Sequence, residues 1–246
     1  MNKFKMAAVI PAYSEARTLR SVVLGVLAEI QLVIVIDDGS TDGTADEISD
    51  LPVRLISHEK NMGKSRSLAD GFREALAAGA EAVITLDGDG QHRPQDISVL
   101  LTEFERYPTS LIIGSRLHEK ESIPPARYYA NRFANFWIAW AAGYPIRDSQ
   151  SGFRIYPATA LSELLPLIEK RRGFVLESEI LILAGWRNIF VRSIPIPAIY
   201  IGGSRPSHFR PVRDIALITF MVAKHLLMRC MHFRGLINSL RGHQSN

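Results

Sequence analysis

Short apolar runs alternate with segments of helical periodicity along the first half of the chain. The apolar runs predict β-strands at residues 7–11, 32–36, 53–57, 82–86 and 111–115. The periodic segments between them predict helices at residues 15–29, 42–48, 61–78 and 94–104. We expect Ser14 to cap the first of these helices and Pro94 to begin the last one.

This alternation predicts an α/β fold with a Rossmann-like, mostly parallel sheet and helices on both faces. In such sheets, ligands bind outside the carboxyl ends of the strands. Polar loops at residues 11–15, 37–44 and 87–91 each follow a predicted strand. We therefore expect these three loops to meet at one ligand-binding edge.

The second half of the chain is less regular. Its expected elements are helices at residues 126–142, 177–184 and 212–236, a polar loop at 149–154 leading into a short strand, and strands at 189–193 and 198–201. The pattern predicts a main α/β domain at residues 1–205 and a C-terminal amphipathic helical extension at residues 206–246.

Composition and charge narrow the class of protein. The chain has 246 residues, 47% of them hydrophobic and 22% charged, which is typical of a globular protein. Its net charge of +4 suits phosphate-bearing substrates or an anionic membrane surface. No zinc-finger spacing, recognition-helix pattern or RNA-binding aromatic signature indicates a nucleic-acid partner. The single cysteine, Cys230, excludes an internal disulfide and favours a cytoplasmic setting.

The membrane signals are those of a surface helix. The longest apolar stretches without charge are residues 133–146 and 215–223, whereas a spanning helix needs about 20 residues. The aromatic segment 128–140 and the segment 212–236, with its late basic residues, each fit either contact with the bilayer interface or packing on the core. We expect peripheral attachment to the cytoplasmic face of a membrane.

Asp87-Gly88-Asp89-Gly90-Gln91 is the strongest candidate for chemistry. Two carboxylates one residue apart at a strand end can project toward one cation, and oxygen ligands favour Mg²⁺ or Mn²⁺. Taken alone, the motif fits a polar turn equally well.

The acidic loop at residues 37–44 fits contact with a nucleotide, and it also fits a helix-capping turn. The basic pair Lys64 and Arg66 near a helix start fits solvated charges better than a phosphate-binding loop, because the P-loop spacing is absent. Glu177 and Glu179 point in different directions on a helix, so at most one of them faces a cleft.

Three further polar segments fit the binding of charged substrate groups. Arg116 follows the fifth strand and can pair with a phosphate. Asp148 begins a dense polar run and can act as a general base or orient its neighbours. Arg205 follows two glycines, an arrangement that fits a mobile loop closing over a diphosphate as well as a surface turn.

Together these segments resemble the GT-A-fold glycosyltransferases of family 2, most closely the dolichol-phosphate mannosyltransferase-like (polyprenyl-phosphate glycosyltransferase) branch. The resemblance spans about residues 5–205. Its motifs follow the family's order, which makes the set specific: PAYSE at 11–15, DDGSTDGT at 37–44, NMGK at 61–64, DGDGQ at 87–91, GSR at 114–116, DSQSGFR at 148–154 and SR at 204–205.

The resemblance implies roles for individual residues. Those that would contact the nucleotide are Pro11, Tyr13, Glu15, Ile36 and Asp38, with Gly88 beside it. The metal ligands would be Asp87, Asp89 and Gln91. The residues that would bind donor or acceptor phosphate are Arg116 and Arg205. Arg205 stands where the branch commonly has lysine, and Glu177 where it often has glutamine.

The implied activity is inverting transfer of a sugar from a nucleotide diphosphate sugar to a lipid-linked acceptor, either polyprenyl phosphate or a lipid hydroxyl. Asp89 and Arg116 would act in catalysis, and a hydroxyl acceptor would make Asp148 the candidate base. The alternatives are transfer to a soluble or polysaccharide hydroxyl, a nucleotidyltransferase, and a non-catalytic binding module. The absence of a glycine-rich triphosphate loop argues against the second alternative.

Overall fold

A mostly parallel sheet forms the centre of the protein. The computed structural model describes residues 3–117, 123, 125–168, 176–197 and 211–241. Its strands are β1 (Met6–Ala12), β2 (Leu32–Asp37), β3 (Arg54–Ser57), β4 (Ala82–Thr85), β5 (Leu111–Ser115), β6 (Arg154–Pro157) and β7 (Val191–Pro195). They follow the order β3-β2-β1-β4-β6-β5-β7 in one sheet. Only β6 pairs antiparallel, with β4 and β5, so the expected mostly parallel sheet is confirmed.

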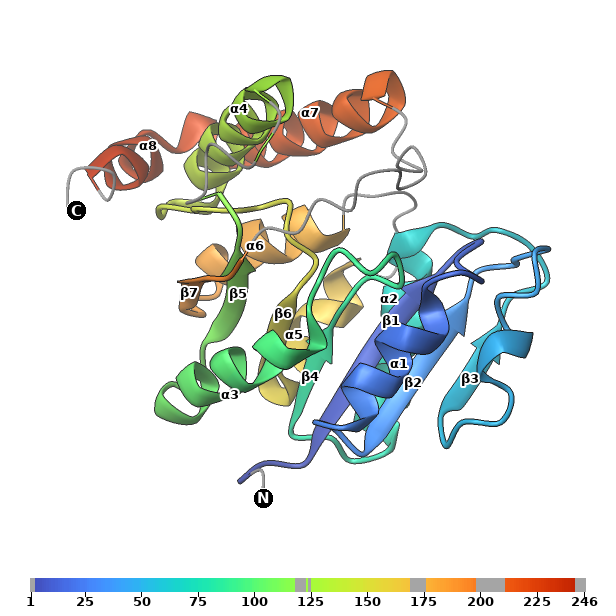
Figure 1. Ribbon diagram of the computed structural model, residues 1–246. Coiled ribbons are helices and arrows are strands. Elements are labelled where there is room, and N and C mark those ends of the chain that lie inside the picture. The colour runs from blue at the N-terminus through green and yellow to red at the C-terminus, as the bar shows by residue number, and fades with distance from the viewer. Residues whose placement is uncertain (1–2, 118–122, 124, 169–175, 198–210, 242–246) are drawn as a thin grey trace.

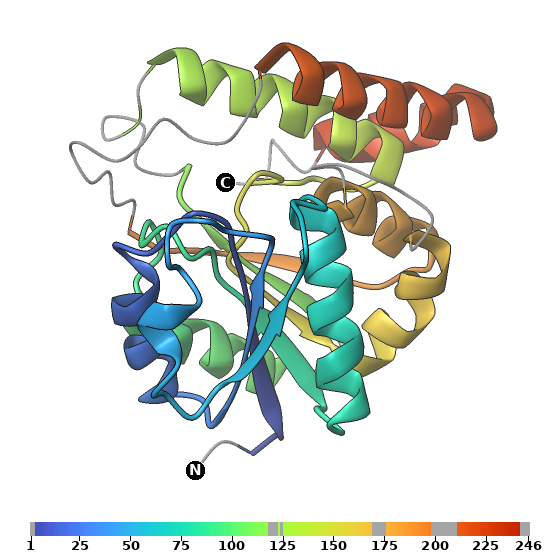
Figure 2. The same ribbon diagram turned by 90° about the vertical axis from the view of Figure 1, so that its right-hand side faces the viewer.

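Alternating side chains of the central strands fill two cores, one on each face of the sheet. In β1, Ala7 and Val9 belong to one core, and Ala8 and Ile10 belong to the other. The first core is covered by α2 (Lys64–Ala77), α5 (Ala158–Ile168) and α6 (Leu176–Trp186). The second is covered by α1 (Leu19–Leu27) and α3 (Ile97–Arg106). Figure 2 shows helices on both sides of the sheet, as the pattern predicts.

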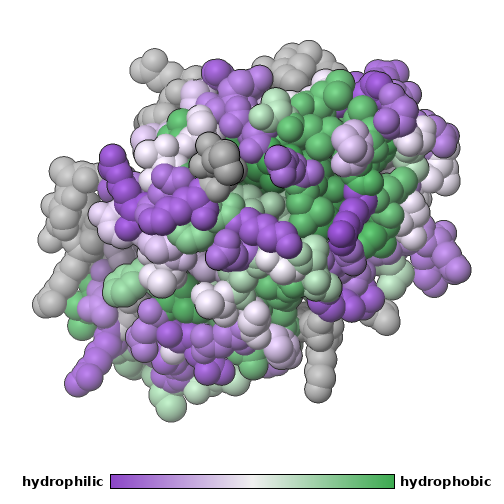
Figure 3. All heavy atoms as spheres, turned by 90° about the horizontal axis from the view of Figure 1, so that it is seen from below, coloured by the Kyte–Doolittle hydropathy of each residue, from purple (hydrophilic) through white to green (hydrophobic). Residues whose placement is uncertain are grey.

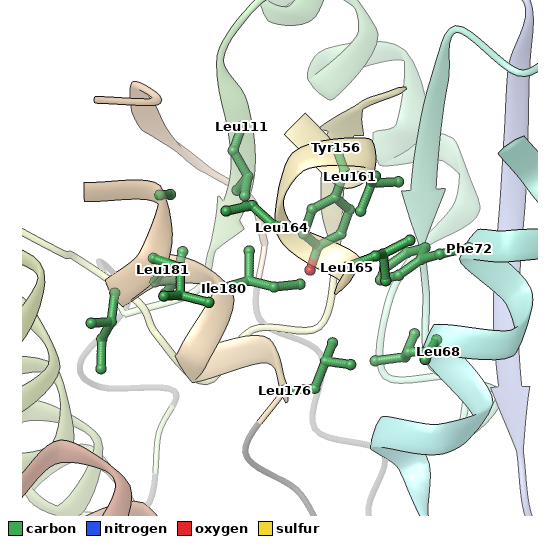
Figure 4. Packing of buried hydrophobic residues seen from close by; sticks show 14 of the residues in the cluster. Leu68, Phe72, Leu111, Tyr156, Leu161, Leu164, Leu165, Leu176, Ile180 and Leu181 are labelled. Carbon is green, nitrogen blue, oxygen red and sulfur yellow. The ribbon is translucent and has the colours of Figure 1, made fainter. Parts of the chain in front are cut away.

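The first core contains the larger side chains. Figure 4 shows Tyr156 of β6 surrounded by leucines of α5, by Ile180 of α6 and by Phe72 of α2. The Phe72 and Tyr156 rings meet edge to face, with their centroids 5.1 Å apart. This packing fixes α2 and α6 relative to the sheet, and both helices carry side chains of the candidate site.

A third group of helices lies beyond the carboxyl ends of the parallel strands. It consists of α4 (Pro125–Ala142), α7 (Pro211–Met228) and α8 (Phe233–Arg241), which we call the helical layer (Figure 1). Trp140 of α4 donates a hydrogen bond to the Met231 carbonyl oxygen at 2.9 Å. His225 of α7 lies 3.0 Å from the Glu179 carboxylate of α6, and both side chains are buried. The first contact ties the layer together, and the second joins the layer to α6.

None of the helices in the described ranges is by itself long and apolar enough to cross a bilayer. Residues 216–228 and 230–240 meet the criteria of length and composition only as a pair, and a bend of 103° separates them.

At the opposite end of the sheet, the described residues form no such layer (Figure 1). Figure 3 views this end, where the chain enters β1, and shows hydrophilic side chains over much of it with hydrophobic ones gathered toward one side. Among the residues that the structure describes, the helices that lie across an end of the sheet are those at its carboxyl end (Figure 1).

Several predicted helices have different bounds in the structure. The first begins at Leu19 rather than at residue 15, and Ser14 is not its cap, because the Ser14 backbone has a positive φ of 57° and its N–H donates to Ser40 Oγ. The helix predicted at residues 42–48 is only a 3₁₀ turn at Asp46–Ile48. The pattern did not predict α5, whose Pro166 argues against a helix.

The single C-terminal helix predicted at residues 212–236 is also wrong. It breaks after Met228, where Cys230, Met231 and His232 all have positive φ angles. The His232 ring packs where a Cβ at Gly143 or Gly235 would lie, so these two glycines make room for the break. The expected strand at residues 198–201 and the domain boundary at 205/206 lie outside the described residues.

A close approach of α2 to β1 depends on Gly71. A Cβ at Gly71 would collide with Cγ1 of Val9. We expect Gly71→Ala to lower the free energy of unfolding by about 1–3 kcal/mol, because the packed core cannot move aside. Urea denaturation measures this change. Val9→Ala removes the colliding methyl groups, so the double variant should lose less stability than the sum of the single losses. Strict additivity would contradict the proposed collision.

Candidate functional site

The loop at residues 87–91, which follows β4, is held at the carboxyl edge of the sheet by hydrogen bonds from two sides. Thr85 Oγ1 donates to the Gly152 carbonyl oxygen at 2.6 Å, which places the loop at residues 148–154 beside the end of β4. Thr18 Oγ1 donates to the Gly88 carbonyl oxygen at 2.7 Å. The segment that carries Asp87 and Asp89 therefore has a fixed path between α1 and the loop at residues 148–154.

A partly buried cluster of three charges forms around Asp87. Lys64 Nζ lies 2.6 Å from Asp87 Oδ1 and 3.2 Å from Glu177 Oε2. Lys64 is only 21% exposed, so the interpretation of this residue as a solvated charge is wrong. A Cβ at Gly152 would lie about 3 Å from Lys64 Nζ and from carboxylate oxygens of Asp87 and Glu177. The cluster leaves no room for a side chain at this position.

The charges in the cluster stabilise one another. Burial alone would lower the pKa of Lys64, but attraction to Asp87 and Glu177 outweighs burial and raises this pKa above its usual value. Burial would raise the pKa of Asp87, but Lys64 and His92 outweigh it and hold this pKa well below its usual range. Asp87 and Lys64 are therefore both charged at neutral pH.

Asp89 lies beside this cluster in a different electrostatic setting. Burial, together with repulsion from Asp87, raises the pKa of Asp89. One of its oxygens accepts a hydrogen bond from the Gln91 N–H at 2.9 Å. His92, which follows the motif directly in the sequence, is buried with Nε2 3.7 Å from Asp87 Oδ2.

The side-chain oxygens of the loop at residues 87–91 fit a hard divalent cation. Asp87 and Asp89 supply carboxylate oxygens and Gln91 an amide oxygen, the ligand type that Mg²⁺ and Mn²⁺ prefer. A cation would also relieve the repulsion that raises the pKa of Asp89. Across the described residues, no three His, Cys, Asp or Glu side chains form a group able to hold a metal. The protein ligands alone would thus leave places for oxygens of a substrate.

The loops expected to bind the nucleotide are tied to one another. The Ser14 N–H donates to Ser40 Oγ and the Glu15 N–H donates to Thr44 Oγ1, each at 2.9 Å. These bonds join the segment that carries Tyr13 and Glu15 to the loop at residues 37–44. The serine and threonine of that loop therefore position the neighbouring loop, a role that the capping interpretation did not include.

The side chains of Asp38 and Ile36 contact other parts of the protein. The Asp38 carboxylate accepts hydrogen bonds from the Met62 and Gly63 N–H groups, both at 2.8 Å. It also lies 2.7 Å from His58 Nδ1. Ile36 is fully buried, and its side chain belongs to the core beneath α2. Asp38 thus fixes the start of α2. The Ile36 side chain faces the core and away from the ligand edge. Pro11 is also buried, within β1.

Asp148 is buried and accepts three backbone hydrogen bonds. Its Oδ2 accepts from the Arg116 N–H at 3.1 Å, and its Oδ1 accepts from the Gln150 and Ser151 N–H groups at 3.2 and 3.1 Å. Arg116 is thereby tied through its main chain to the loop at residues 148–154. Arg205 lies outside the described residues.

Arg154 fixes the main chain of the same loop by hydrogen bonds, a role that the sequence did not reveal. Its guanidinium is fully buried and donates to the carbonyl oxygens of Ser151, Ser149 and Glu177, at 2.7 to 2.8 Å. The signal in the sequence was an arginine at the end of a polar run that enters an apolar strand. Such an arginine must find acceptors, because an unpaired buried charge is costly.

The ordered motifs and this geometry agree with comparisons to known proteins. Residues 7–171 match the family described as Glycosyl transferase family 2. The chain belongs to glycosyltransferase family 2.

Two curated relatives place this family 2 glycosyltransferase in the dolichol-phosphate glycosyltransferase-like branch. One is the UDP-N-acetylglucosamine–dolichyl-phosphate N-acetylglucosaminyltransferase of Methanococcus voltae, 29% identical over 78% of this chain and 84% of that protein. The other is the human dolichyl-phosphate beta-glucosyltransferase, 26% identical over 82% of this chain and 69% of that protein.

A solved structure confirms the GT-A fold. Glucosyl-3-phosphoglycerate synthase from Mycobacterium tuberculosis, in complex with Mn²⁺, UDP and phosphoglyceric acid, superposes with a TM-score of 0.64. The match covers 93% of this chain and 79% of that one at 19% sequence identity, so the likeness concerns the fold.

The bonding of Asp148 generates a prediction. We expect Asp148→Asn to lower the free energy of unfolding by about 1–3 kcal/mol, because the amide NH₂ would face a backbone N–H donor. Urea denaturation measures the loss, and Asp46→Asn on the exposed 3₁₀ turn is the control. If Asp148→Asn kept full stability and lost only turnover, Asp148 would act as a base instead.

Proposed function

We propose that this protein is a metal-dependent inverting transferase that moves a sugar from a nucleotide diphosphate sugar to a polyprenyl phosphate. The observation that carries the proposal is the acidic pair Asp87 and Asp89 at the sheet edge, on the side where the helical layer lies. The relatives that act on dolichyl phosphate support a lipid-linked acceptor.

The proposed reaction is a single displacement at the anomeric carbon of the donor sugar. An oxygen of the acceptor phosphate forms a bond to this carbon while the bond to the donor diphosphate breaks, and the nucleoside diphosphate leaves with the electron pair. Attack from the face opposite the leaving group inverts the configuration. Because the acceptor phosphate is already an anion, no base has to remove a proton.

Residues of this chain would meet the two charged ends of the reaction. Asp87, Asp89 and Gln91 would hold Mg²⁺ or Mn²⁺, which when bound offsets the negative charge on the departing diphosphate. Arg116 and Arg205 would pair with donor or acceptor phosphate through their guanidinium groups. Tyr13, Glu15 and the main chain near Pro11, Ile36 and Gly88 would line the nucleotide.

The bonds of Asp148 favour a phosphate acceptor over a hydroxyl acceptor. A hydroxyl would need a base, and both oxygens of the Asp148 carboxylate already accept backbone hydrogen bonds. We therefore assign Asp148 to positioning the main chain of Arg116.

The helical layer would bring the protein to a lipid-embedded acceptor. On α7, Phe220 and Leu227 are 72% and 71% exposed, although the opposite side of the helix, with Met221 and Leu226, is buried. On α4, Phe133 is 65% exposed, and Phe233 of α8 is 66% exposed. An outward helix face is usually charged in a protein surrounded by water, so these side chains indicate an apolar partner.

The charge of the layer favours an anionic membrane surface as that partner. Exposed basic side chains accompany the apolar ones: Arg132, Lys224, Arg229 and Arg234. Residues 125–142 and 216–240 contain no aspartate or glutamate. Each basic side chain near an anionic bilayer contributes about 1 kcal/mol to binding. We propose peripheral attachment of this layer to the cytoplasmic face of a membrane.

The activity can be tested with a screen of nucleotide sugars. Each is incubated with Mg²⁺ or Mn²⁺, with and without polyprenyl phosphate, and release of nucleoside diphosphate is measured. We expect release that depends on metal and on polyprenyl phosphate, and a loss of at least 100-fold in Asp89→Ala. Asp46→Ala should retain activity because Asp46 is exposed and outside the site. Equal activity of Asp89→Ala would show that the metal assignment is wrong.

Membrane attachment can be tested by flotation with vesicles. We expect Phe220→Ser with Leu227→Ser to weaken binding to anionic vesicles at least tenfold, because the outward apolar face is lost. The matched control is Phe190→Ser, whose side chain is 75% exposed but precedes β7, outside the layer. The proposal would be contradicted if the wild-type protein floated neither with anionic vesicles nor with neutral ones.

A further inference from the structure

The proposed metal site already contains a cation that belongs to the protein. Lys64 Nζ lies 2.6 Å from Asp87 Oδ1, a carboxylate oxygen expected to bind metal. The same ammonium lies 3.2 Å from Glu177 Oε2. The ammonium therefore offsets one of the two negative charges that Asp87 and Glu177 bring to the group next to Asp89.

The position of Lys64 is set by its surroundings. Gly63, the residue before α2, has a φ of 92°, and its N–H donates to the Asp38 carboxylate at 2.8 Å. On the other side, Arg154 donates to the Glu177 carbonyl oxygen at 2.7 Å and so holds the first turn of α6. Lys64 and Glu177 thus meet from two anchored helix starts, and the contact is a built feature of the fold.

This arrangement has a consequence for a free metal ion. A divalent ion bound by Asp87 and Asp89 would lie close to the Lys64 ammonium, and like charges repel strongly in a partly buried site. As described above, no three His, Cys, Asp or Glu side chains in the described ranges form a group able to hold a metal, so the ion would depend on few protein ligands while it is repelled by Lys64. A nucleoside diphosphate adds both negative charge and oxygen ligands, so it changes the balance in favour of the metal.

We propose that Lys64 is an internal counter-cation that keeps free divalent metal weakly bound, so that the metal binds together with the nucleotide diphosphate. Glu177 is the positioning residue that shares the charge of Lys64. The inference rests on the proposed metal-dependent function, and it assigns a regulatory role to the lysine at the start of α2.

Titration with Mn²⁺, followed by electron paramagnetic resonance in the absence of nucleotide, tests the inference without measuring turnover. We expect Lys64→Met to bind Mn²⁺ at least tenfold more tightly than wild type, because the repelling ammonium is gone. The matched control is Lys60→Met, which removes the same charge from an exposed side chain. It should bind Mn²⁺ like wild type.

Glu177→Gln is a second variant, and we expect it to change Mn²⁺ affinity in the opposite direction. It removes a negative charge and leaves Lys64 to Asp87 alone, so Mn²⁺ binding without nucleotide should weaken at least threefold. General damage to the site would weaken binding in both variants. Opposite changes therefore distinguish the electrostatic role from misfolding, and thermal unfolding confirms that each variant is folded.

The same titration in the presence of UDP or GDP separates the two proposals. If wild type binds Mn²⁺ with nucleotide but Lys64→Met binds free Mn²⁺ no more tightly than Lys60→Met, the role of Lys64 is overturned and the proposed metal site stands. If Mn²⁺ binds to none of these proteins with either nucleotide, the metal site and the role of Lys64 both fail.

Discussion

The buried guanidinium of Arg154 is the interaction on which the site depends. It lies inside the protein at the start of the antiparallel strand β6, and its donors reach backbone carbonyl oxygens rather than a single carboxylate. Removing a charge from water is costly, and only a complete set of acceptors in fixed positions offsets that cost. Those acceptors belong to the loop at residues 148–154 and to the first turn of α6. Satisfying Arg154 therefore requires both segments to take the conformation that the site needs.

The charges at the sheet edge follow from this arrangement. Because the loop is held down, Gly152 lies against the ion cluster, and the absence of a side chain there lets Lys64 reach Asp87 and Glu177 together. The Asp87 carboxylate is stabilised by the ammonium, whereas neighbouring Asp89 experiences repulsion from Asp87. Two carboxylates one residue apart thus have opposite electrostatic settings. Spacing alone does not reveal this difference, because it depends on side chains from α2 and α6.

The predictable part of the structure is the part that local pattern determines. Strand positions and the order of the motifs follow from apolar runs and from turn residues at strand ends, so the parallel sheet and its ligand edge could be predicted. The break after Met228 could not, because it contains neither glycine nor proline and depends on space beside Gly143, which follows the end of α4. The role of Lys64 was missed for a related reason. A lysine at a helix start is usually solvated, and only the tertiary fold brings two carboxylates to it.

The first turn of α6 links the site to the helical layer. Glu177 points to Lys64 at the sheet edge, and Glu179, two residues later, is buried against His225 of α7. Residues two apart on a helix face different directions, so one turn can contact both regions. The outward side of α7 carries the apolar residues proposed to meet the membrane, while its inward side is fixed to α6 by a buried polar contact. The buried contact thus connects the layer to the same turn of α6 that reaches the ion cluster, as the proposed reaction at a membrane-embedded phosphate would require.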